Sequence, residues 1–268
     1  MPDFYNNDEL KIYRGEDFVI SKHIHIHQVS LGEICDYGEQ EYYSMVYQFC
    51  ATPQNFKWQL WDAGIDYTEI TPWELFYSLL YKLYPQNNTS IIFGDLDFTK
   101  FELKQRVDDG SVFLYQKIKA KNNTTNNVFS KILNTFNNDY EDVIIDEFTY
   151  NMIVDYLRDV HNIVKDEKIP ANESTKMILI EDAKDEYEAN KNKENHSILK
   201  NLISSMVNSE GFKYDHSQVW DMKINAFMDS VKRISKIKNA NLLLQSGYSG
   251  FGINLKGLEK EIDWLGEL

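Results

Sequence analysis

Basic residues are scarce in this sequence, and their shortage argues against one broad class of function. The chain of 268 residues has 28 lysines and arginines against 42 aspartates and glutamates, which gives a formal net charge of -14. Such a surface repels phosphate backbones, whereas nucleic-acid-binding proteins usually present a basic face. We therefore expect no nucleic acid among the partners of this chain.

Cysteines and long apolar runs are also few. Cys35 and Cys50 both lie in segments with helical spacing, which predicts reduced packing residues rather than a disulfide framework. No segment approaches the roughly 18 uninterrupted apolar residues of a membrane span. The opening residues, MPDFYNNDEL, lack the basic and apolar regions of a signal peptide. We expect neither export nor insertion, and so no membrane partner.

Apolar and aromatic side chains are abundant instead, at 43% and 14% of the residues, which is enough to build a core. Three places carry the residues that typically begin a helix, a capping box or a Thr-Pro pair: Ser30 with Glu33, Thr52 with Pro53, and Thr71 with Glu74. The apolar spacing that follows each of them predicts helices over 31–49, from Pro53, and from Pro72 to a stop at Pro85.

Other segments have the composition or the period-two spacing of strands. They are Phe18–Ile26, Ser90–Phe93, a hairpin of Lys100–Val107 and Val112–Lys117 around a turn at Asp108–Gly110, and Val143–Ile145. An amphipathic helix is expected next, from Phe148 to Val160.

The composition changes near residue 165 and again near residue 195. The segment between them is highly charged and predicts a solvated helix and linker. Helical spacing returns at Ile198–Met206 and Ile224–Ile237, with Gly247 as the expected C-cap and a short closing helix in 255–268. The prediction is a helix-rich α+β protein: a mixed domain with short antiparallel strands over 1–165, a charged helix or linker over 166–195, and a helical domain over 196–268.

Histidines form the sharpest chemical pattern. His23, His25 and His27 alternate along the expected strand, so all three would project from one face, as metal-binding strands do in some zinc enzymes. A polar, solvent-facing strand gives the same pattern, with Ile24 and Ile26 turned to the core. No carboxylate lies at a diagnostic spacing, and we favour the polar surface, with no metal and no other cofactor.

Two further motifs favour ordinary structure. The run Gly247–Gly252 does not match a phosphate loop, a dinucleotide fingerprint or a nucleophile elbow, because a helix precedes it and the required residues are missing. Asp95 and Asp97 could mimic an acidic metal-binding pair, but such a pair at a strand end is common. We therefore expect no catalytic residues and no enzyme.

Aromatic residues recur through the central helices, in a stripe that includes Trp58, Trp61, Trp73, Tyr77 and Tyr81. Such a stripe is more often part of a core than of a ligand site. Any part of it that is exposed would make a protein-binding patch, since Trp and Tyr dominate the energetics of interfaces.

Segments at both ends of the chain carry a family resemblance. They are His25–Gln28 leading into Leu31–Ile34, Tyr37–Gly38, Tyr42–Val46, Ala51–Pro53, Trp220–Met222, Phe227–Val231 and Leu242–Gly250. With these segments the chain resembles proteins encoded among the tail-morphogenesis genes of phages of low-GC Gram-positive bacteria, and more loosely tail assembly chaperones. The family has no fixed motif, so no functional residue is carried over.

The resemblance implies a non-catalytic role in the host bacterial cytoplasm. The protein would bind other phage tail proteins, such as the tape-measure protein, so that apolar helices do not aggregate before assembly. An acidic surface around an apolar groove suits such a chaperone or adaptor. Two alternatives stay open: a structural component retained in the tail or neck of the virion, which implies a stable oligomer, and a metal-dependent enzyme that uses His23, His25 and His27.

Overall fold

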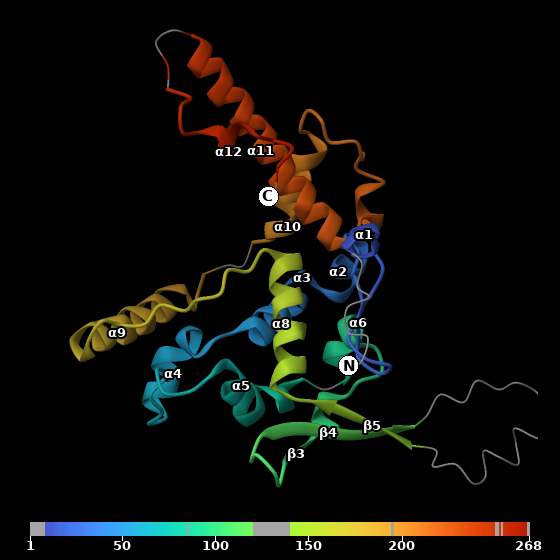
Figure 1. Cartoon of the computed structure of the whole chain (residues 1–268), viewed down its shortest axis with the longest axis vertical. Helices are drawn as coiled ribbons and strands as arrows, with labels where there is room; N and C mark the ends of the chain where they lie inside the picture. The colour runs from blue at the N-terminus through green and yellow to red at the C-terminus, as the bar shows by residue number, and fades with distance from the viewer. Residues whose placement is uncertain are drawn as a thin grey trace, which may run out of the picture.

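The computed structural model describes residues 9–84, 86–119, 140–193, 196–249, 252 and 254–266. Helices predominate, and short antiparallel strands pair in two small sheets, which confirms the predicted helix-rich α+β class. Figure 1 shows a body with a sheet at one end and a long C-terminal helix that projects from the other end. No helix within the described residues has the length and apolar character needed to cross a membrane.

The larger sheet has the strand order β3-β4-β5, with β3 at Glu102–Gln105, β4 at Val112–Lys119 and β5 at Tyr140–Ile145. Both pairings are antiparallel. The predicted hairpin and the predicted strand near residue 143 are therefore confirmed. Gly110 lies in the hairpin turn with a φ of 72°, a conformation that glycine adopts without steric cost.

The predicted strand over Phe18–Ile26 is instead a tight hairpin. Strands β1 (Phe18–Val19) and β2 (His25–Ile26) pair antiparallel, with Phe18 opposite Ile26. The Ile20 N–H donates to the carbonyl of Ile24 at 3.0 Å, which closes the turn. The side chains of Ile20, Ile24 and Ile26 still reach the core. The alternation in the sequence was real, but the chain reverses in the middle of it.

The helices of the body are α1 (Glu9–Arg14), α2 (Leu31–Tyr37), α3 (Glu39–Cys50), α4 (Lys57–Asp62), α5 (Pro72–Leu75), α6 (Gln86–Phe93) and α8 (Glu147–His161). The capping box before α2 forms as predicted: the Glu33 N–H donates to Ser30 Oγ at 3.2 Å, and the Ser30 N–H donates to Glu33 Oε2 at 2.7 Å. The box of Thr71 and Glu74 forms in the same way before α5. At Thr52, a 3₁₀ turn over Pro53–Phe56 leads into α4.

Two predictions in the body are wrong. The helix expected over 31–49 is broken at Gly38, whose φ of 109° ends α2 and begins α3. The segment Ser90–Phe93 is the end of α6 and not a strand, because a short apolar run fits either periodicity. Ile92 and Phe93 are buried as expected, but from a helix.

Aromatic rings form the centre of the body. The ring of Phe49 stacks on Tyr84 with centroids 4.4 Å apart and lies within 5.4 Å of the rings of Phe76, Phe93 and Phe98. These residues come from α3, α6 and the turns between α5 and β3, so one cluster ties together segments that are distant in sequence.

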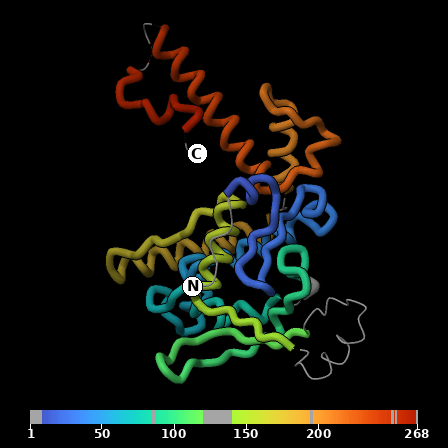
Figure 2. Tube along the Cα trace, turned by 45° about the vertical axis from the view of Figure 1, so that its right-hand side comes forward, coloured from blue at the N-terminus to red at the C-terminus, as the bar shows by residue number. Residues whose placement is uncertain are grey.

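The C-terminal part contains α9 (Glu173–Asn190), α10 (Ile198–Val207), α11 (Ile224–Tyr248) and α12 (Glu259–Ile262). Figures 1 and 2 both show α11 and α12 beyond the body. The Ile224 N–H donates to the carbonyl of Val29 at 2.9 Å, which fixes the base of α11 to the body. Gly247 lies inside α11, so the predicted C-cap there is wrong, and the closing helix is shorter than expected.

Candidate functional site

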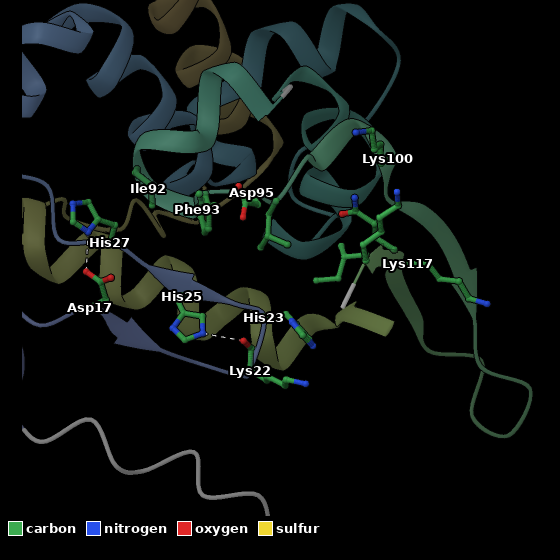
Figure 3. Close-up of a pocket in the computed structure, with 15 residues that line it drawn as sticks. Asp17, Lys22, His23, His25, His27, Ile92, Phe93, Asp95, Lys100 and Lys117 are labelled. Atoms are coloured by element: carbon green, nitrogen blue, oxygen red, sulfur yellow. Dashed lines mark hydrogen bonds and ion pairs between the residues drawn. The ribbon is translucent and has the colours of Figure 1, made fainter. Parts of the chain in front are cut away.

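A cavity of about 840 Å³ lies between the β1-β2 hairpin, the end of α6 and β4. Its polar lining residues are Asp17, Lys22, His23, His25, His27, Asp95, Lys100, Gln116, Lys117 and Lys119. Figure 3 shows the histidines on the hairpin side, with Phe93 and Asp95 across the cavity from them. The structure thus brings together residues that the sequence kept apart, the alternating histidines and Asp95 of the acidic pair after α6.

His27 is held between two carboxylates. Its Nδ1 lies 2.9 Å from Asp17 Oδ1, and its Nε2 lies 3.3 Å from Glu33 Oε1. Burial raises the pKa of Glu33, but hydrogen bonds from Ser30 and from His27 outweigh it and lower the pKa to about 2. His27 therefore bridges Asp17, which precedes β1, and Glu33 in the first turn of α2.

His25 and His23 have different partners. The Nε2 of His25 donates to the carbonyl of Lys22 at 3.0 Å, across the hairpin turn. His23 Nε2 contacts the carboxylate of Glu141 on β5, which also accepts from Lys22 Nζ at 2.5 Å. The hairpin is thereby tied to the larger sheet through Glu141.

These contacts do not assemble a metal centre. Within the described ranges, no group of three or more histidine, cysteine, aspartate or glutamate residues is placed to hold a metal ion. His23, His25 and His27 all line the cavity and alternate with buried Ile24 and Ile26, but each ring contacts a separate partner. The alternative of a metal-dependent enzyme stays a prediction.

The acidic pair divides between two roles. Asp97 caps the 3₁₀ turn Phe98–Lys100, accepting from the Thr99 N–H at 3.0 Å and pairing with Lys100 Nζ at 3.2 Å. Burial raises the pKa of Asp97, but these hydrogen bonds outweigh it and lower the pKa below its usual value. Asp95 lines the cavity instead.

Gln116 is the residue that the sequence did not identify. It lies on β4, lines the cavity and is only 6% exposed. Its Oε1 has no hydrogen-bond partner in the described part of the chain. Leu114 and Gln116 share the core-facing side of β4, and a glutamine inside this alternation is the signal that could have identified it.

The aromatic stripe is divided by burial. Trp73 and Tyr81 are in the core and are each 5% exposed. Tyr77 and Trp58 are half-buried, and Trp58 packs on Tyr187 of α9 with ring centroids 5.1 Å apart. Trp61, 37% exposed, is the most accessible of the five. The prediction of a protein-binding patch rests on Trp61 and on the exposed edges of Trp58 and Tyr77.

The glycine-rich motif lies only partly within the structure. Gly247, Tyr248 and Ser249 continue or end α11, while residues 250 and 251 are outside the described residues. A helix does precede the glycines, as expected.

Comparison with known proteins relates the C-terminal region to one family model. The model described as the YomV second domain matches residues 190–265, the part of the chain that contains α10, α11 and α12. No curated protein and no solved structure matches the chain significantly. The similarity covers less than half of the chain and points to a phage-associated, YomV-like protein.

Proposed function

We propose that this chain is a non-catalytic phage tail assembly factor that binds another tail protein through its C-terminal arm. The arm is defined as the described residues of α11, α12 and the segment that ends at Gly266. The family match supports the phage association, and the sequence resemblance supports tail morphogenesis.

The observation that carries the proposal is the exposed apolar surface of the arm. Leu242, Tyr248 and Leu265 are 64%, 83% and 75% exposed. Large apolar side chains that are exposed on a projecting element are typical of a surface that binds another protein. Their burial against a partner would remove this surface from water.

Internal contacts give the arm a defined shape before it binds. At its base, Ile224 and Phe227 are buried, and Tyr13 Oη donates to Asp229 Oδ2 at 3.3 Å. Farther along, Arg233 Nη1 donates to the carbonyls of Trp264 and Gly266, both at 2.8 Å. The closing segment is thus held back onto α11, and an ordered surface costs less entropy on binding than a disordered one.

The test combines particle analysis with capture from infected cells. The full-length protein and its Leu242→Asp variant are used as baits, and Val107→Asp is the matched control, because Val107 is fully exposed in the β3-β4 turn. We expect tail proteins to be recovered with the parent and with Val107→Asp, and to be lost with Leu242→Asp. Purified particles should lack the protein.

Two outcomes would overturn the proposal. Stoichiometric presence in purified particles would make the protein a structural component of the virion. Equal recovery of tail proteins by Leu242→Asp and the parent would place binding outside the arm.

A further inference from the structure

We propose that the cavity beside the histidine hairpin binds a small organic phosphate, a molecule with a phosphate group and with hydroxyl or N–H donors. This inference goes beyond the arm and does not depend on the proposed assembly role. It rests on an unsatisfied buried acceptor, on the charge of the cavity and on its shape.

The unsatisfied acceptor is Oε1 of Gln116. A buried polar atom without a partner costs about 1–3 kcal/mol, and an apolar residue of similar shape would avoid that cost. Leucine would fit the alternation of β4 equally well, since Leu114 precedes Gln116 on the same face. A ligand hydroxyl or N–H that donates to Oε1 would satisfy the atom and account for a glutamine at this position.

The charge of the lining is opposite to that of the chain. Four lysines line the cavity against two aspartates, in a protein of net charge -14. Lys22 pairs with Glu141 and Lys100 with Asp97. For Lys117 and Lys119, both exposed on β4, no ion pair is found within the described residues. A local basic surface attracts anions, and lysine is a common ligand of phosphate.

The remaining walls suit a small organic molecule. Ile92, Phe93 and Leu96 form an apolar side next to the polar groups, and Ile118 lies beside Gln116 on β4. The volume of about 840 Å³ lies within the range of roughly 300–1,000 Å³ that is usual for small-molecule sites. His25 is oriented by its bond to the Lys22 carbonyl, which leaves Nδ1 available to a ligand.

The experiment is calorimetric titration of the full-length chain at low ionic strength with four probes. Glucose 6-phosphate and adenosine monophosphate carry both phosphate and donor groups, inorganic phosphate lacks the organic part, and glucose lacks the phosphate. We expect at least one organic phosphate to bind more tightly than inorganic phosphate and glucose. The ratio of the affinities for glucose 6-phosphate and adenosine monophosphate shows whether the ligand is a sugar phosphate or a nucleotide.

Variants then locate the binding. Gln116→Leu should lower the affinity for the organic phosphate by about tenfold, which is the effect of losing one buried hydrogen bond. The same variant should melt no lower than the parent when no ligand is present, because it removes an unsatisfied acceptor. The double variant Lys117→Ala/Lys119→Ala should also weaken binding by about tenfold. Lys82→Ala/Lys213→Ala is the charge-matched control on exposed lysines outside the cavity, and it should leave binding unchanged.

Three results would overturn the inference. If no phosphate compound binds at millimolar concentration, the cavity is not a phosphate site. Equal affinity for glucose and glucose 6-phosphate would indicate a neutral carbohydrate site. Equal affinity in the parent and in both cavity variants would place the site elsewhere.

Discussion

The body and the C-terminal arm differ in how they hold their side chains. In the body, Phe49 is 1% exposed and is enclosed by other rings. Along the 25 residues of α11, the described buried side chains are Ile224, Phe227 and Ala240, and two of them lie at the base. The body is thus stabilised by its own core, whereas most of the arm faces solvent. A substitution in the arm can therefore test binding without unfolding the protein.

The largest expected effect is on the aromatic core. Phe49→Ala should lower the free energy of unfolding by about 3–5 kcal/mol, because it removes the ring at the centre of the cluster and leaves a cavity. Leu242→Ala should change it by less than about 0.5 kcal/mol. Urea denaturation followed by tryptophan fluorescence measures both values. A large loss of unfolding free energy in Leu242→Ala would show that this side chain is packed in solution. It would contradict the contrast between a self-stabilised body and a solvent-facing arm.

The second prediction concerns pH and a buried histidine of the body. His161 Nδ1 donates to the Leu157 carbonyl at 2.8 Å, and its Nε2 accepts from Tyr42 Oη at 2.7 Å, so the ring is neutral. Burial lowers the pKa of His161 from 6.5 to about 4. The unfolded chain binds the proton more readily, so the contribution of this group is fully present above pH 6.5 and is lost as the pH falls toward 4. The loss should be about 3 kcal/mol.

The measurement is the free energy of unfolding at several pH values between 4 and 6.5. In His161→Gln the free energy of unfolding should change less steeply with pH over this interval than in the parent. The carboxylates of Glu33 and Asp66 have pKa values lowered from 4.5 and 3.8 to about 2, so their contribution is lost mainly below pH 4.5, and it is common to the parent and the variant. An unchanged slope in His161→Gln would assign the pH dependence to other groups.

Much of the fold was predictable where local chemistry determines it. The capping boxes at Ser30 and Thr71 and the hairpin turn at Gly110 each depend on residues a few positions apart, and all three formed as predicted. The errors arose where tertiary packing decides. The short apolar run Ile91–Phe93 fits a strand or a helix, and here it ends α6, where the His27 N–H donates to the Ile92 carbonyl at 2.8 Å.

The candidate site was predictable only in part. The sequence identified the histidines and Asp95 as separate motifs, but not that α6 and the hairpin enclose one cavity. Nor could it identify Gln116, because the importance of that residue comes from burial without a partner. Spacing along one segment gives the direction of neighbouring side chains, whereas a cavity between segments depends on how they pack.

The smallest expected effect is at α9, the charged helix that docks on α4. Lys176 Nζ lies 2.6 Å from Asp66 Oδ2 and 2.9 Å from Glu173 Oε1. The hydrogen bond from Lys176 is the main cause that lowers the pKa of Asp66 to about 2. Asp66→Asn should therefore loosen α9 without unfolding the body, because the aromatic core does not depend on this pair.

The matched control is Asp62→Asn. Asp62, the last residue of α4, pairs with Lys184 of α9 at 3.0 Å, but both side chains are half exposed, and exposed ion pairs contribute little. Hydrogen exchange of the amides in residues 173–190 should accelerate several-fold in Asp66→Asn and remain near the parent rate in Asp62→Asn. Equal acceleration in both variants would mean that α9 is held by the sum of its surface charges. An effect confined to Asp66 would show that one nearly buried lysine holds the charged helix against the body.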